Sequence, residues 1–125
     1  PFYLNAHYTH LSQLNRALLE AICRYLGINT LITDSADYEL CEGKSERLAD
    51  LCAQARATEY VSGPSASGYL EELPFVQLGI KVSWFSYDGY PAYPQLRGDF
   101  SHGVSILDLL LNCGREAGRA MRFVS

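Results

Sequence analysis

The segment Ile80–Tyr87, with the sequence IKVSWFSY, is the clearest strand signal in the chain and decides the expected fold. Residues of this kind, β-branched and aromatic, favour strands. Two shorter segments, Ile28–Thr33 (INTLIT) and Glu59–Ser62 (EYVS), share this character. Helix-length apolar patterns separate the three segments, and strands that alternate with helices typically form a parallel sheet. We therefore expect an α/β fold: a layered parallel sheet built from βαβ units, with helices on both faces.

Apolar periodicity predicts helices around these strands. The first, over residues 11–26, has leucine or isoleucine at positions 11, 14, 18, 22 and 26, and Gly27 stands where a C-cap glycine belongs. Further patterns predict helices over about 44–56, 65–78 and 101–114. No internal repeat and no flexible linker divides the sequence. We expect residues 1–125 to form a single α/β domain, the C-terminal half of a longer protein.

The predicted helix over 101–114 combines a broad apolar surface with a narrow polar stripe. In a helix that turns about 100° per residue, the polar stripe contains Ser101, Ser105, Asp108 and Asn112. The apolar residues cover about two thirds of the circumference, so the helix is expected to be buried on most sides. A buried carboxylate needs a partner. Either the stripe lines a site, or Asp108 and Asn112 bond neighbouring backbone groups.

Composition excludes several classes of function. The chain has 10 basic and 14 acidic residues, a net charge of −4, and no basic run, which argues against nucleic acid as a partner. The longest apolar run, Ile106–Leu111, contains Asp108, so no membrane span is expected. No charged-then-apolar leader is visible. We expect a cytoplasmic location.

The four cysteines, at positions 23, 41, 52 and 113, form no CxxC pair. They are expected to be reduced, buried thiols rather than a disulfide framework or a zinc site. His7 and His10 have a spacing that a metal can use on a helix, but no third ligand lies nearby in the sequence. No metal is therefore expected, and the sequence does not identify a cofactor.

Two segments contain candidate anion-binding groups. Gly43-Lys44-Ser45 has the ending of a Walker A loop, but Tyr38 occupies the position of the first glycine, so a P-loop is rejected. Lys44 and Arg47 can still hold a phosphate or carboxylate at a helix start, or they form a solvated helix terminus whose charges pair with Glu46 and Asp50. The turn Ser62-Gly63-Pro64 follows a strand and begins a helix, which also suits an anion.

Between the last strand and the last helix lies a loop rich in tyrosine, at positions 87, 90 and 93. Such a loop can stack a sugar or a base, although aromatic residues are equally expected at the exit of a core strand. His102 follows at the start of the last predicted helix. It is a candidate cap, a candidate partner of Asp108 or a candidate general base.

Several of these motifs, taken together, resemble the WbqC-like protein family. They are Glu42–Leu48, Tyr60–Pro64 with Tyr69-Leu70, Tyr93–Leu96 with Gly98 and Phe100, Ser105–Leu109, and Asn112–Gly114. Their order and spacing match from about Leu11 to Gly114. Members of that bacterial family are about twice this length, so the resemblance covers their C-terminal half.

The resemblance implies a role in the biosynthesis of O-antigen or other surface polysaccharides. It points to a transferase that acts on a nucleotide-linked sugar or on an acyl or aminoacyl donor, and the alternative is a non-catalytic binding or scaffolding domain that supports a partner enzyme. The partner expected from it is an anionic small molecule. The motif positions carried here as candidate substrate-binding residues are Glu42, Lys44, Arg47, Ser62, Gly63, Gln95, Asp108 and Asn112.

We expect Lys44 and Arg47 to share one cleft with Ser62–Pro64, at the carboxyl ends of the strands. Asp108 should then pair with a cation from another segment, with Lys44, Arg47 and Arg97 as the leading candidates.

Overall fold

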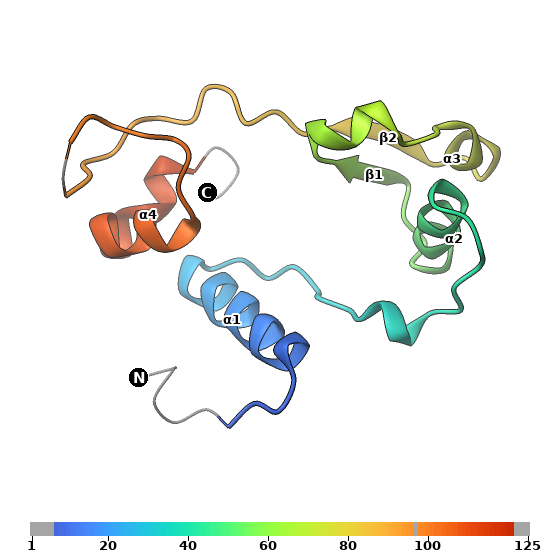
Figure 1. Cartoon of the computed structure of the whole chain (residues 1–125), viewed down its shortest axis with the longest axis horizontal. Coiled ribbons are helices and arrows are strands. Elements are labelled where there is room, and N and C mark those ends of the chain that lie inside the picture. The colour runs from blue at the N-terminus through green and yellow to red at the C-terminus, as the bar shows by residue number, and fades with distance from the viewer. Residues whose placement is uncertain (1–6, 97, 122–125) are drawn as a thin grey trace. The chain divides into compact units, whose positions relative to one another are not determined.

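The structure, a computed structural model, describes residues 7–96 and 98–121. The chain divides into two compact units, one formed by Pro1–Ile32 with Gly89–Ser125 and the other by Thr33–Asp88 (Figure 1). Each unit is described by itself, and the single domain expected from the sequence stays a prediction.

The unit formed by residues 33–88 contains a two-stranded parallel sheet. Strand β1 (Glu59–Ser62) pairs with strand β2 (Lys81–Trp84), and the register places Tyr60 opposite Val82. Figure 1 shows the two arrows side by side and pointing the same way. The parallel pairing confirms the expectation for these two strands, although β2 is shorter than the predicted segment 80–87.

Helices α2 (Ser45–Gln54) and α3 (Leu73–Gln77) build the core of this unit against one face of the sheet. Ala49 and Cys52 from α2 join Phe75 and Ile80 in a buried cluster that Val82 and Tyr60 adjoin. The rings of Tyr60 and Phe75 stack with centroids 4.9 Å apart.

Within this unit, the expected helices on both faces of the sheet are not found. Side chains alternate between the faces of a strand, so the face opposite Tyr60 carries Glu59, Val61, Lys81 and Ser83. Lys81 and Ser83 both donate hydrogen bonds to the Glu59 carboxylate. A largely polar face of this kind does not require a helix to cover it.

Two short helical turns complete the unit, η1 (Ser35–Asp37) and η2 (Pro64–Gly68). The helix predicted over 65–78 is therefore wrong, because η2 and α3 are separate elements. Pro74 stands in the first turn of α3, where proline begins a helix readily but does not continue one.

The second unit is helical in its described residues. Helix α1 (Leu11–Leu26) has the predicted bounds and ends at Gly27, whose φ of +73° is the left-handed conformation that glycine tolerates best. Helix α4 (Ile106–Cys113) continues into the 3-10 segment η3 (Gly114–Ala120), which contacts α1. Leu109 and Ala117 are buried here.

Three expectations for this unit are corrected. The segment Ile28–Thr33 is extended after α1 but pairs with no described strand, and Arg16 instead donates a hydrogen bond to the Ile32 carbonyl, at 2.8 Å. Helix α4 starts at Ile106 rather than residue 101, because the Ser105 hydroxyl caps it by accepting from the Leu107 N–H. The helix is also less buried than expected, with Leu111 86% exposed.

Among the described residues, no helix combines the length and the apolar character that crossing a membrane requires.

Candidate functional site

Asp108 lies in the first turn of α4 and is only partly exposed. Its Oδ2 atom accepts a hydrogen bond from the Tyr93 hydroxyl at 2.8 Å and another from Gln95 Nε2 at 3.0 Å. Its other carboxylate oxygen, Oδ1, forms no hydrogen bond with any residue that the structure describes. The described hydrogen bonds therefore orient the carboxylate through Oδ2 alone.

Gln95 connects this carboxylate to the loop that precedes α4. Its Oε1 atom accepts from the Ser101 N–H at 2.9 Å, and its Nε2 donates to the Ser101 carbonyl at 3.0 Å. One amide thus satisfies both backbone groups of Ser101 while it also donates to Asp108. We call Gln95, Ser101, Tyr93 and Asp108 the Asp108 cluster.

The described partners of Asp108 are neutral, and the expected pairing of Asp108 with a cation stays a prediction. A tyrosine hydroxyl and a primary amide provide its hydrogen bonds, and neither bears a positive charge. Arg97, one of the three expected cations, lies outside the described residues, and no described residue forms an ion pair with Asp108. Within the described part of the chain, two neutral donors on one oxygen satisfy the partly buried carboxylate.

Asn112 bonds a neighbouring backbone group, which is one of the two interpretations of the polar stripe. Its Nδ2 donates to the Asp108 carbonyl at 2.8 Å, one turn earlier on the same helix. The amide is therefore used within α4. Among the described contacts, Asp108 is the one stripe residue whose own side chain bonds side chains of a preceding segment, those of Tyr93 and Gln95.

Aromatic rings adjoin the Asp108 cluster. The ring of Phe100 meets that of Tyr93 edge to face at 5.1 Å, and the ring of His102 at 4.5 Å. Burial, and then the hydrogen bond to the Asp108 carboxylate, raise the pKa of Tyr93. Tyr93 and Phe100 belong to the motifs that carry the family resemblance, but no pattern in the sequence links either of them to Asp108.

The second group of candidate residues surrounds the start of α2, in the other unit. Lys44 is exposed and forms no hydrogen bond or ion pair with a described residue. Arg47 donates through Nε to the Cys41 carbonyl at 3.0 Å. The expected alternative, pairing with Glu46 and Asp50, is absent among the described contacts, since Asp50 accepts from Gln54 instead.

Glu42 and Gly43 precede Lys44 in an exposed turn. The φ of Gly43 is +95°, and an added Cβ would meet the carboxylate of Glu46. Ser45, buried just after Lys44, accepts from the Glu71 N–H at 2.9 Å. The positive φ at position 43 therefore favours glycine in this turn. The hydrogen bond between Ser45 and Glu71 anchors the turn to the rest of its unit.

Ser62 is buried at the end of β1, and Gly63 follows it with an extended backbone. Among the described contacts, no hydrogen bond or ion pair joins Lys44 or Arg47 to Ser62–Pro64. Their predicted convergence in one cleft therefore stays a prediction.

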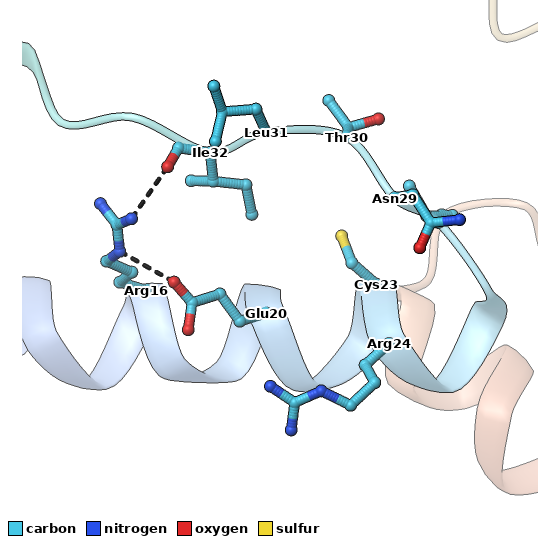
Figure 2. A pocket seen from close by; sticks show the side chains of 9 residues that line it. Arg16, Glu20, Cys23, Arg24, Asn29, Thr30, Leu31 and Ile32 are labelled. Atoms are coloured by element: carbon cyan, nitrogen blue, oxygen red, sulfur yellow. Dashed lines mark hydrogen bonds and ion pairs between the residues drawn. The ribbon is translucent and has the colours of Figure 1, made fainter.

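Sequence reasoning missed a pocket of about 410 Å³ between α1 and the extended segment that follows it. Figure 2 shows Arg16 closing one end by bonding both Glu20 and the Ile32 carbonyl, while Cys23 points toward the extended segment. The sequence predicts a strand over Ile28–Thr33, and this prediction gives no indication that the segment lines a pocket beside α1.

The cysteines and histidines differ in their exposure. The four cysteines are free thiols in the structure, but the burial expected for all of them holds for Cys52 alone, because Cys23 and Cys113 are half-buried and Cys41 is exposed. Burial raises the pKa of the Cys52 thiol. His7 and His10 are exposed, and within residues 7–96 and 98–121 no three His, Cys, Asp or Glu side chains gather as metal ligands do.

The described residues form a mixed α/β protein with a small parallel sheet and a carboxylate, that of Asp108, held by neighbouring side chains. Residues 1–120 match the WbqC-like protein family, and the chain belongs to that family. It is also similar to a protein of Mycobacterium tuberculosis (strain ATCC 25618 / H37Rv) named "Uncharacterized protein Rv1507c", with 59% identity over 123 residues. That match covers 98% of this chain and 53% of the relative, so the chain spans about half of the relative's length. No solved structure matches the chain.

Proposed function

We propose that the protein acts in the biosynthesis of surface-polysaccharide precursors, as a cytoplasmic transferase on a nucleotide-linked sugar or on an acyl or aminoacyl donor. Membership of the WbqC-like family supports the pathway, through the association of that family with O-antigen synthesis. The observation that carries the proposal is the Asp108 carboxylate, which Tyr93 and Gln95 orient through Oδ2 while Oδ1 makes no hydrogen bond to a described residue.

A transferase needs a group that orients the acceptor. Asp108 Oδ1 can accept a hydrogen bond from the hydroxyl or amine of an acceptor, and it can receive its proton as transfer proceeds. Holding the carboxylate in place beforehand reduces the loss of freedom when the acceptor binds. Gln95 supplies this positioning, whereas Asn112 acts within α4.

A transferase of this kind also needs a cation for its donor. Lys44 is the best candidate, because it is exposed and unpaired among the described residues. Arg47 is anchored through Nε alone, so its terminal nitrogens can take part. Glu42, Ser62 and Gly63 belong to the same proposed donor site through their motif positions.

A second candidate is a non-catalytic binding or scaffolding domain that supports a partner enzyme. The observation that favours it is the structural use of three predicted site residues: Arg47, Gln95 and Asn112 each bond backbone groups of their own unit. Such contacts serve stability as readily as chemistry.

A ligand panel tests the proposal. Full-length protein is mixed with nucleotides, nucleotide-sugars and acyl or aminoacyl donors, and thermal shifts are measured before turnover is sought by mass spectrometry. We expect an anionic donor to raise the melting temperature of the wild type, and Lys44→Ala to abolish the shift. Binding with no product formed from any donor and acceptor pair would favour the scaffolding alternative.

A further inference from the structure

The Asp108 cluster also indicates which class of molecule Asp108 Oδ1 meets, an inference that rests on the function proposed above. Phe100 and His102 flank Ser101, the residue whose two backbone groups Gln95 holds. Because the same Gln95 amide donates to Asp108, it ties both aromatic residues to the carboxylate. Gln95 is therefore a positioning residue for the acid and for the rings.

The aromatic side chains form a connected set that leads away from Asp108. Phe100 packs edge to face with Tyr93, and with His102 at an interplanar angle of 87°. Tyr93 in turn reaches Asp108 through its hydroxyl. Phe100 is partly exposed and His102 is exposed, so ring surface in contact with Tyr93, the hydrogen-bond partner of Asp108, is accessible to solvent.

The charge of this region selects against phosphate. Asp108 is an anion, and no lysine or arginine among the described residues bonds or pairs with it. Among the described residues Asp108 has only neutral partners, and a carboxylate repels a second anion. We therefore assign the phosphates of a donor to the proposed donor site, and we expect the group that meets Asp108 to be uncharged and rich in hydrogen-bond donors.

The geometry points to a polyhydroxylated ring, such as a pyranose, as the acceptor that the Asp108 cluster binds. Ring hydroxyls donate to Asp108 Oδ1, and the apolar C–H face of the sugar packs on Phe100 and His102. Binding sites commonly combine an apolar surface with a few oriented polar groups in this way.

The test is an NMR titration of the ¹⁵N-labelled full chain with glucose, galactose and N-acetylglucosamine, each added separately. Uridine diphosphate serves as a reference ligand for the proposed donor site. At least one sugar is expected to shift the amide signals of Phe100–His102 and of residues 107–109, with saturation.

Matched variants assign the roles. Phe100→Leu keeps an apolar side chain but removes the flat ring, and it should weaken sugar binding about fivefold or more, whereas Phe100→Tyr should bind as the wild type does. Asp108→Asn should weaken binding about tenfold, since a hydrogen bond to a charged group is lost. Tyr69→Leu, an exposed aromatic residue of the other unit, is the control and should change nothing.

The outcomes separate this inference from the function on which it rests. Binding of uridine diphosphate without any sugar-induced shift near Asp108 would overturn the inference and leave the proposed donor site intact. Failure of both ligands to bind would overturn the proposed function as well. Equal sugar affinity of Phe100→Leu and the wild type would show that the aromatic surface is not part of the sugar site.

Discussion

Gln95 and Asp108 are joined by a hydrogen bond of 3.0 Å from Nε2 to Oδ2, although they lie 13 residues apart in the sequence. The amide that makes this bond also holds Ser101 by its N–H and its carbonyl. One side chain therefore fixes the end of a loop against the first turn of α4.

The other unit contains a second arrangement of the same kind. Gln54 donates to the Glu39 carbonyl at 2.6 Å, accepts from the Glu39 N–H at 3.1 Å and donates to Asp50 at 2.9 Å. In both units, one glutamine amide pairs with both backbone groups of a loop residue and with an aspartate. Glutamine suits this task because it carries a donor and an acceptor side by side.

The first prediction concerns the loop before α4. Gln95→Ala removes every bond that the amide makes and should lower the free energy of unfolding by about 1–2 kcal/mol. The Ser101 amide should exchange with solvent at least about tenfold faster, because its acceptor is lost. Hydrogen exchange followed by NMR measures this directly.

Gln54→Ala is the matched control for that experiment. It should speed exchange at Glu39 and leave Ser101 unaffected, and Gln95→Ala should do the reverse. Unchanged protection of Ser101 in Gln95→Ala would show that the loop is held by other contacts.

Local patterns in the sequence predicted the elements that depend on local chemistry. Helix α1 has the expected bounds because its leucine spacing determines its apolar face and Gly27 determines its end. Strands β1 and β2 were found because β-branched and aromatic residues favour strands, and their parallel pairing followed from the helix between them.

Elements that depend on distant partners were not predictable in this way. The segment Ile28–Thr33 has strand character, but a strand also needs a neighbour, and composition does not supply one. The same limit applies to the candidate site. Asp108 was identified from its place on a helix, whereas its partners Tyr93 and Gln95 depend on how the intervening loop folds back.

The free energy of unfolding at alkaline pH should depend on the ionisation of Tyr93. Burial raises the pKa of its hydroxyl, so the folded state holds the proton more tightly than the unfolded state does. The resulting stability is present below the ordinary tyrosine pKa and is lost as the pH rises through the folded value. The gap in stability between wild type and Tyr93→Phe should therefore shrink from about pH 9 to about pH 11.

Urea denaturation at several pH values measures this gap. Tyr69→Phe, at an exposed tyrosine, provides the control because it should give a gap near zero at every pH. A constant gap between wild type and Tyr93→Phe across the range would contradict the coupling between Tyr93 and its surroundings.

The acidic side of the profile should report on Glu59. The hydrogen bond from Ser83, together with Lys81, lowers the pKa of this carboxyl. Its contribution to stability is therefore present above the ordinary glutamate pKa and is lost as the pH falls through the lowered value. Glu59→Gln should flatten the stability profile between about pH 5 and about pH 3, as measured by urea denaturation. A profile as steep as that of the wild type would assign the acid sensitivity to other carboxyls.

The cysteines should react in the order of their exposure. Cys41 is exposed, whereas Cys52 is buried and has a raised pKa, which leaves less of the reactive thiolate. In the native protein at neutral pH, maleimide should label Cys41 first and Cys52 only on unfolding. Peptide mapping by mass spectrometry identifies the labelled positions, and Cys41→Ser should remove the fast phase. Early labelling of Cys52 would indicate that the core around Phe75 opens readily.

The last prediction separates a structural from a functional role for Asp108. Asp108→Asn keeps the shape of the side chain and an oxygen that can accept from Tyr93 and Gln95, so the free energy of unfolding should fall by only about 1 kcal/mol. Removal of the charge takes away the proton acceptor at Oδ1, so transferase turnover should fall at least about 100-fold. Tyr93→Phe is the comparison, because it removes a supporting hydrogen bond and leaves the carboxylate charged. It should reduce turnover less than Asp108→Asn does while costing similar stability. Full turnover in Asp108→Asn, with a large drop in melting temperature, would show that Asp108 serves only to hold the loop on α4.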